Sequence, residues 1–210
     1  MAGVWRVDSI FNLKVARMID FLISKFVKNS QNTSDPSVRT RYGTFAGTVG
    51  IIVNVVLSLA KIIAGTVFNS ISVTADGINN LSDAGSSVVT LIGFKISAKP
   101  ADRDHPFGHE RIEYLAGFVL GIVILIIGVE LIKSSANRII NPKPAICSGI
   151  MIAVLTVSIA IKLWLARFYS KIADNISSSA IRAASADSMN DVLTTSAVLC
   201  GVLVSKYFGY

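Results

Sequence analysis

The chain has 210 residues, of which 52% are hydrophobic and 16% are charged, and its mean hydropathy is +0.61. A soluble domain usually carries about 25% charged residues, so this composition indicates an all-α integral membrane protein and excludes a disulfide-rich secreted domain. The net charge of +7 does not indicate a nucleic-acid partner, because the basic side chains lie between apolar runs rather than on a soluble face with aromatic platforms. The expected partner is the lipid bilayer.

Residues 1–41 precede the first long apolar run and form the first expected domain. The apolar side chains that recur there at three- and four-residue steps are Val7, Phe11, Val15, Met18 and Leu22. With basic residues between them, they predict an amphipathic helix over residues 1–30 on the cytoplasmic membrane surface, and a partly disordered tail is the alternative. Residues 29–41 are expected to form a polar linker with a turn at Asp35-Pro36.

Residues 42–210 form the expected transmembrane domain. Its apolar stretches predict five membrane-spanning helices, at about 43–68, 71–97, 112–137, 145–169 and 176–205. Most Lys and Arg residues fall on one side of these spans, which predicts a multi-pass protein with its N-terminus in the cytoplasm. Lys61 and Lys162 lie in the first and fourth spans and are expected near helix ends, where long side chains reach back to the membrane surface.

The second span carries polar residues that an apolar chain would otherwise avoid. Asp76, Asn79 and Asp83 recur at three- and four-residue steps, which places them on one helical face that must point into protein or water. The fifth span repeats the pattern with Asp187 and Asp191. At 1.5 Å per residue the two groups lie roughly 12–18 Å and 16–23 Å deep, so both approach the middle of the bilayer.

Three carboxylates and one amide at one point repel one another unless a cation or protons neutralise them. A site that binds a metal ion and protons alternately has the chemistry of an antiporter. Oxygen ligands without His or Cys favour a hard ion such as Mn²⁺ over Zn²⁺, with Mg²⁺, Ca²⁺, Fe²⁺ and Co²⁺ as alternatives. A buried polar network that only holds the helices together is the competing interpretation.

The loop between the second and third spans, PADRDHPFGHERIE, contains both histidines of the chain. Asp102, His105 and His109 have the donor types of a second, peripheral metal site. The competing interpretation, a solvated loop before a helix, fits the sequence equally well.

Three separated motifs together resemble the cation diffusion facilitators, a family of dimeric exchangers of divalent metals and protons. They are SISVTADGINNLSDAGSS, PADRDHPFGHERIEYLAG and ADSMNDVLTTSAVL. The resemblance implies a transport site made of Asn79, Asp83, Asp187 and Asp191, and it matches Asp102, His105 and His109 to the family's loop site. The zinc-type pattern has Asp where this chain has Asn79 and His where it has Asp187. The chain therefore resembles the manganese-type branch.

Members of that family usually have a sixth span and a cytoplasmic ferredoxin-like domain. Because the sequence ends after the fifth expected span, we expect a fragment of such a protein, homodimeric when full length. The predicted function is export of Mn²⁺ from the cytoplasm in exchange for protons across the plasma (inner) membrane, without a cofactor and without enzymatic activity, and with Asp76 on the proton path. An exporter of Fe²⁺, Co²⁺ or Zn²⁺, a passive cation channel and an intramembrane aspartyl protease are the alternatives.

Overall fold

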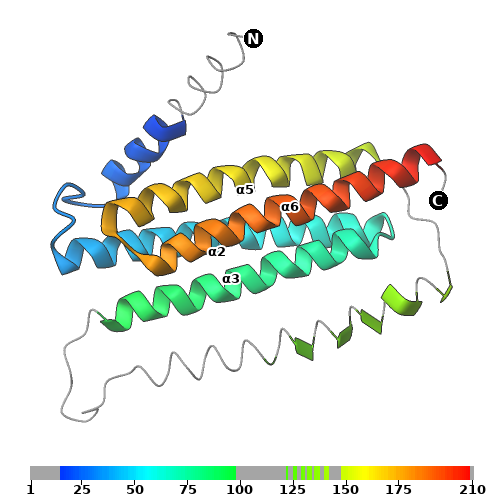
Figure 1. Cartoon of the computed structure of the whole chain (residues 1–210), viewed down its shortest axis with the longest axis horizontal. Helices are drawn as coiled ribbons and strands as arrows, with labels where there is room; N and C mark the ends of the chain where they lie inside the picture. The colour runs from blue at the N-terminus through cyan, green and yellow to red at the C-terminus, as the bar shows by residue number, and fades with distance from the viewer. Residues whose placement is uncertain are drawn as a thin grey trace, which may run out of the picture.

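The computed structural model describes residues 15–97 and 148–208, together with isolated positions between 122 and 141. Four long helices dominate these residues, and they run alongside one another as an elongated bundle (Figure 1). They are α2 (Pro36–Val67), α3 (Ile71–Ser97), α5 (Gly149–Ile176) and α6 (Ser179–Phe208). No strand occurs in the described part of the chain, so the expected all-α class is confirmed.

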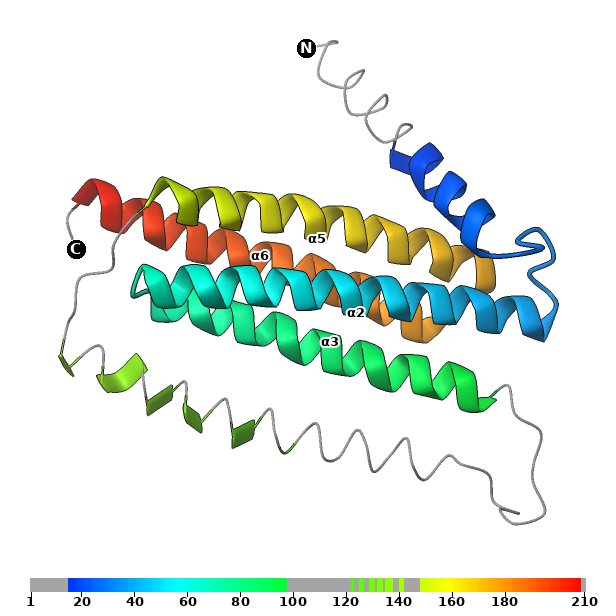
Figure 2. The ribbon, with the colours of Figure 1, turned by 180° about the vertical axis from the view of Figure 1, so that it is seen from behind.

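The bundle consists of two antiparallel hairpins. A three-residue turn joins α2 to α3, and a two-residue turn joins α5 to α6. Asn69 and Ser177 have positive φ angles of 55° and 49°, which lets the chain reverse sharply at each turn. The hairpins also pack on each other, α2 against α5 and α3 against α6. As Figure 2 shows from behind, α2 and α6 therefore begin at the same end of the bundle, where α3 and α5 finish.

The start of α2 corrects one expectation. The polar linker was expected to extend to residue 41, but the helix begins at Pro36. The Asp35 side chain caps it by accepting a 2.8 Å hydrogen bond from the Ser37 N–H, and proline suits the first helical turn. The same hydrogen bond lowers the pKa of the Asp35 carboxyl. Capping therefore starts the helix about two turns earlier than hydropathy indicates.

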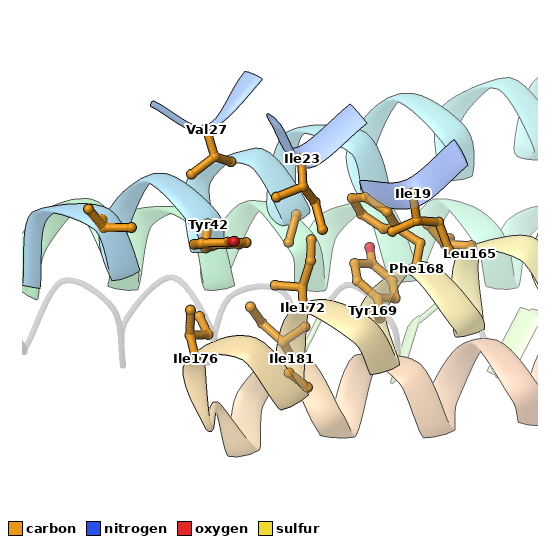
Figure 3. Packing of buried hydrophobic residues seen from close by; sticks show 13 residues of the cluster. Ile19, Ile23, Val27, Tyr42, Leu165, Phe168, Tyr169, Ile172, Ile176 and Ile181 are labelled. Atoms are coloured by element: carbon orange, nitrogen blue, oxygen red, sulfur yellow. The ribbon is translucent and has the colours of Figure 1, made fainter. Parts of the chain in front are cut away.

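The N-terminal helix is confirmed over residues 15–26, and it also buries side chains that the sequence did not single out. Ile19, Ile23 and Val27 pack on α2 and α5 in a buried cluster (Figure 3). Met18, which was expected on the membrane-facing stripe, is 45% exposed, and the neighbouring Phe21 is more exposed still. Helical residues 15–26 are thus part of the bundle's packing.

Three of the described helices are long and apolar enough to cross a membrane: Pro36–Val67, Gly149–Ile176 and Ser179–Tyr207. α3 is not among them because polar residues interrupt its apolar sequence. On α2, Ile52, Val56, Leu59 and Ile63 form an exposed apolar stripe at three- and four-residue steps, as a lipid-facing helix requires. The expected span at 112–137 lies mostly outside the described residues.

Candidate metal centre

The two polar faces expected from the sequence meet inside the bundle. α3 supplies Asn79 and Asp83, and α6 supplies Asp187 and Asp191. One carboxylate oxygen from each of the three aspartates lies within 4.8 Å of the others. The Asn79 side chain joins them by donating a 2.8 Å hydrogen bond from Nδ2 to Asp191 Oδ1. Side chains more than one hundred residues apart therefore form one cluster, which we call the carboxylate centre.

The carboxylate centre borders a cavity of about 360 Å³. Asp83 and Asp187 line it, together with Asn54, Tyr169 and Ala180. Since Ala180 is the second residue of α6, the cavity extends from the centre toward the end of the bundle at which α2 and α6 begin. Asp191 lies behind it and is only 3% exposed. The centre thus combines an accessible side with a buried one.

The structure adds to this centre a residue whose role the sequence did not indicate. Lys162 was expected near a helix end, but it lies thirteen residues after Gly149 and fourteen before Ile176, in the middle of α5. That is about 20 Å from either end of the helix, too far for a lysine side chain to reach the membrane surface. The snorkelling expectation is therefore wrong, and Lys162 is 1% exposed.

The Lys162 ammonium lies between two of the three aspartates. Its Nζ donates a 2.9 Å hydrogen bond to Asp83 Oδ2 and a second hydrogen bond to Asp191 Oδ2. A charged side chain in the apolar stretch SIAIKLWLA needs such partners, because an unpaired ammonium is costly inside a membrane domain. The position of Lys162 within a long apolar run was the signal in the sequence that could have identified it.

Lys61 was expected near a helix end as well, and it too is buried, with 0% exposure. Its Nζ lies 2.9 Å from Asp76 Oδ2 and donates a 3.0 Å hydrogen bond to Thr195 Oγ1. The Thr195 hydroxyl in turn donates to the Asp76 carboxylate. We call Lys61, Asp76 and Thr195 the Lys61 triad. It lies about one to two helical turns from the carboxylate centre, on the side away from the cavity.

The two clusters differ in charge. The Lys61 triad contains one positive and one negative group, while the carboxylate centre has three aspartates and one lysine. The carboxylate centre therefore has more negative than positive groups, which favours a cation, and its oxygen ligands suit hard divalent ions. Asp102, His105 and His109, the residues of the expected loop site, lie outside the described residues.

Comparison with known proteins assigns the chain to a family. The sequence model described as the cation efflux transmembrane domain matches residues 47–210. The chain therefore belongs to the cation efflux family, and the resemblance to the cation diffusion facilitators is confirmed.

Several curated proteins match the same part of the chain. An uncharacterized transporter of Methanocaldococcus jannaschii is 35% identical over 159 residues, which are 76% of this chain and 56% of that protein. The manganese efflux system protein MneS of Bacillus subtilis is 33% identical over 79% of this chain and 57% of its own length. MneP, named a manganese efflux system protein of the same bacterium, is 32% identical over 75% and 52%. The chain thus spans about half the length of these relatives.

Proposed function

We propose that the chain is the membrane part of an exporter that moves Mn²⁺ out of the cytoplasm in exchange for protons. The observation that carries the proposal is the convergence of three carboxylates from α3 and α6 at the edge of a cavity inside a membrane bundle. Asn79 completes the ligand set when its amide oxygen turns toward the ion. Membership of the cation efflux family supports transport of a cation rather than catalysis.

Manganese is the proposed cargo for two reasons. The candidate ligands are all oxygen donors, which suit Mn²⁺ better than they suit Zn²⁺. Two relatives, MneS and MneP, are named as manganese efflux proteins. Fe²⁺, Co²⁺ and Zn²⁺ are the alternatives within the same proposal.

The direction of transport follows from the proposed orientation in the plasma (inner) membrane. With the N-terminus in the cytoplasm, α2 and α6 begin on that side. The cavity at Asp83 and Asp187 then receives ions from the cytoplasm, and the Lys61 triad separates the centre from the outside. In this conformation the carboxylate centre is accessible to a metal ion from the cytoplasm.

Protons are the proposed counter-ions because crowded carboxylates that lose a metal ion gain stability by binding protons. Asp76 lies between the carboxylate centre and the outer end of the bundle, so a proton moving inward would pass it. The loop site of Asp102, His105 and His109 and the homodimer remain predictions.

Transport in liposomes tests the proposal. The chain is reconstituted with a Mn²⁺-sensitive dye and an imposed pH gradient, and we expect Mn²⁺ flux that depends on that gradient. Asp83→Ala should abolish the flux, because it removes a ligand that lines the cavity. Asp174→Ala is the matched control, since Asp174 is an exposed aspartate that pairs with Arg182. Unchanged flux in Asp83→Ala would refute the site, and a flux indifferent to the pH gradient would indicate a passive channel.

A further inference from the structure

The carboxylate centre already holds a cation, the ammonium group of Lys162. We propose that Lys162 is a tethered competitor of the transported ion: its ammonium occupies the centre when no metal is bound, leaves when a divalent ion binds, and keeps monovalent ions out. The inference rests on the proposed function, because it assumes that the transported metal binds at Asp83, Asp187 and Asp191.

The first argument is that the metal and the ammonium need the same atoms. Lys162 Nζ lies 2.9 Å from Asp83 Oδ2 and also hydrogen-bonds Asp191 Oδ2. A hard divalent ion binds carboxylate oxygens at about 2.0–2.6 Å. An ion held by both of these oxygens would therefore occupy the space in which the ammonium lies. Because two cations in contact also repel strongly, only one of them can be present.

The second argument is that Lys162 cannot reach the membrane surface, so a displaced ammonium stays near the centre. It lies at the middle of α5, and its side chain is 1% exposed. A cavity of about 360 Å³ lies beside Asp83, one of the lysine's two carboxylate partners, and is also lined by Asp187. We infer that the displaced ammonium turns toward this cavity and stays close to the carboxylates. It can then return as soon as the metal leaves.

The third argument concerns selectivity. Replacing the Lys162 ammonium by Na⁺ or K⁺ exchanges one single charge for another, so the carboxylates gain no electrostatic stabilisation. A divalent ion brings twice the charge of the ammonium and gains more from the three carboxylates, which together offer three negative charges. Divalent ions therefore displace the tethered ammonium and monovalent ions do not, which makes Lys162 a specificity-determining residue.

The first test measures Mn²⁺ binding to the chain in detergent by calorimetry, with Lys162→Met. We expect the affinity for Mn²⁺ to rise by about tenfold or more, because the competitor is gone. We also expect 100 mM-range NaCl to weaken Mn²⁺ binding to the variant about fivefold or more, and to change wild-type binding less than about twofold. N-methylglucamine chloride at equal concentration controls for ionic strength.

Lys61→Met is the matched control for this variant. It removes a second buried lysine that is also paired with an aspartate, but one outside the carboxylate centre. We expect no gain in Mn²⁺ affinity and no new sensitivity to Na⁺. A folded Lys162→Met protein with unchanged or weaker Mn²⁺ affinity, or without Na⁺ sensitivity, would overturn the inference.

A second measurement needs no substitution and decides the question even if Lys162→Met fails to fold. The chain is labelled with ¹⁵N at the lysine Nζ, and NMR spectra are recorded during titration with Cd²⁺, a diamagnetic divalent ion. We expect the signal of Lys162 to shift as the metal binds, while the signal of Lys61 stays in place. A Lys162 signal that stays in place in the metal-bound protein would refute displacement. Absence of metal binding to wild type would instead refute the proposed function itself.

Discussion

The two buried lysines of the bundle lie in opposite chemical situations. Lys61 pairs with one carboxylate, Asp76, and the Thr195 hydroxyl on α6 hydrogen-bonds both of them. Lys162 is shared between Asp83 and Asp191, and a third aspartate of the same centre faces a cavity. A buried ion pair that is balanced in charge and enclosed by protein stabilises the fold. We expect a buried ammonium to exchange for another cation when its carboxylate partners carry surplus negative charge and a cavity lies beside them.

Loss of the Lys61–Asp76 ion pair should have the largest effect on stability. Lys61→Met leaves the Asp76 carboxylate buried and unpaired, and loss of one partner of a buried pair costs about 3–5 kcal/mol. We expect the free energy of unfolding in detergent to fall by about this amount, with no recovery on addition of Mn²⁺. Denaturant titration followed by circular dichroism measures it.

The double variant Lys61→Met with Asp76→Leu should restore most of that stability, because it replaces both charged groups by apolar ones. If Lys61→Met proved as stable as wild type, or if Mn²⁺ restored its stability, the Lys61 triad would not stabilise the bundle. The proposed difference between Lys61 and Lys162 would then be wrong.

A smaller effect is expected at the hydroxyl of the Lys61 triad. Thr195→Val keeps the side-chain shape but removes the hydroxyl that hydrogen-bonds both charged groups, and we expect a loss of about 1.5–3 kcal/mol in total. Because Lys61 and Asp76 still pair directly, the loss should be smaller than that of Lys61→Met. The same denaturant titration measures it, with Thr194→Val, at an exposed neighbour, as the control. Equal stability of the two threonine variants would show that the Thr195 hydroxyl does not stabilise the ion pair of Lys61 and Asp76.

Much of the architecture could be predicted from the sequence, because helical periodicity is local. Steps of three and four residues placed Asn79 and Asp83 on one face and Asp187 and Asp191 on another, and the structure brings these faces together. Length and apolar content also predicted the two hairpins, but two helix boundaries were misplaced. α2 starts earlier because the Asp35 cap outweighs the polar character of residues 36–41, and α5 continues to Ile176 although its span was expected to end near residue 169.

The partners of the lysines could not be predicted, because they depend on tertiary contacts between helices that are distant in the sequence. Lys61 meets Thr195 across 134 residues, and Lys162 meets Asp83 across 79. A lysine in an apolar run indicates either an interfacial side chain or a buried ion pair, and only the position of the helix ends separates the two. With α5 extending from Gly149 to Ile176, Lys162 is central and must be paired.

If the carboxylate centre binds a divalent ion, Mn²⁺ should bind to the chain at equilibrium, and calorimetry measures this. Calorimetry should show saturable binding to wild type and to the surface control Asp174→Asn. Asp191→Asn should lose at least about a hundredfold in affinity, because Asp191 is the buried carboxylate that contacts both Asn79 and Lys162. If Asp191→Asn bound Mn²⁺ with the wild-type affinity, the carboxylate centre would not be the metal site.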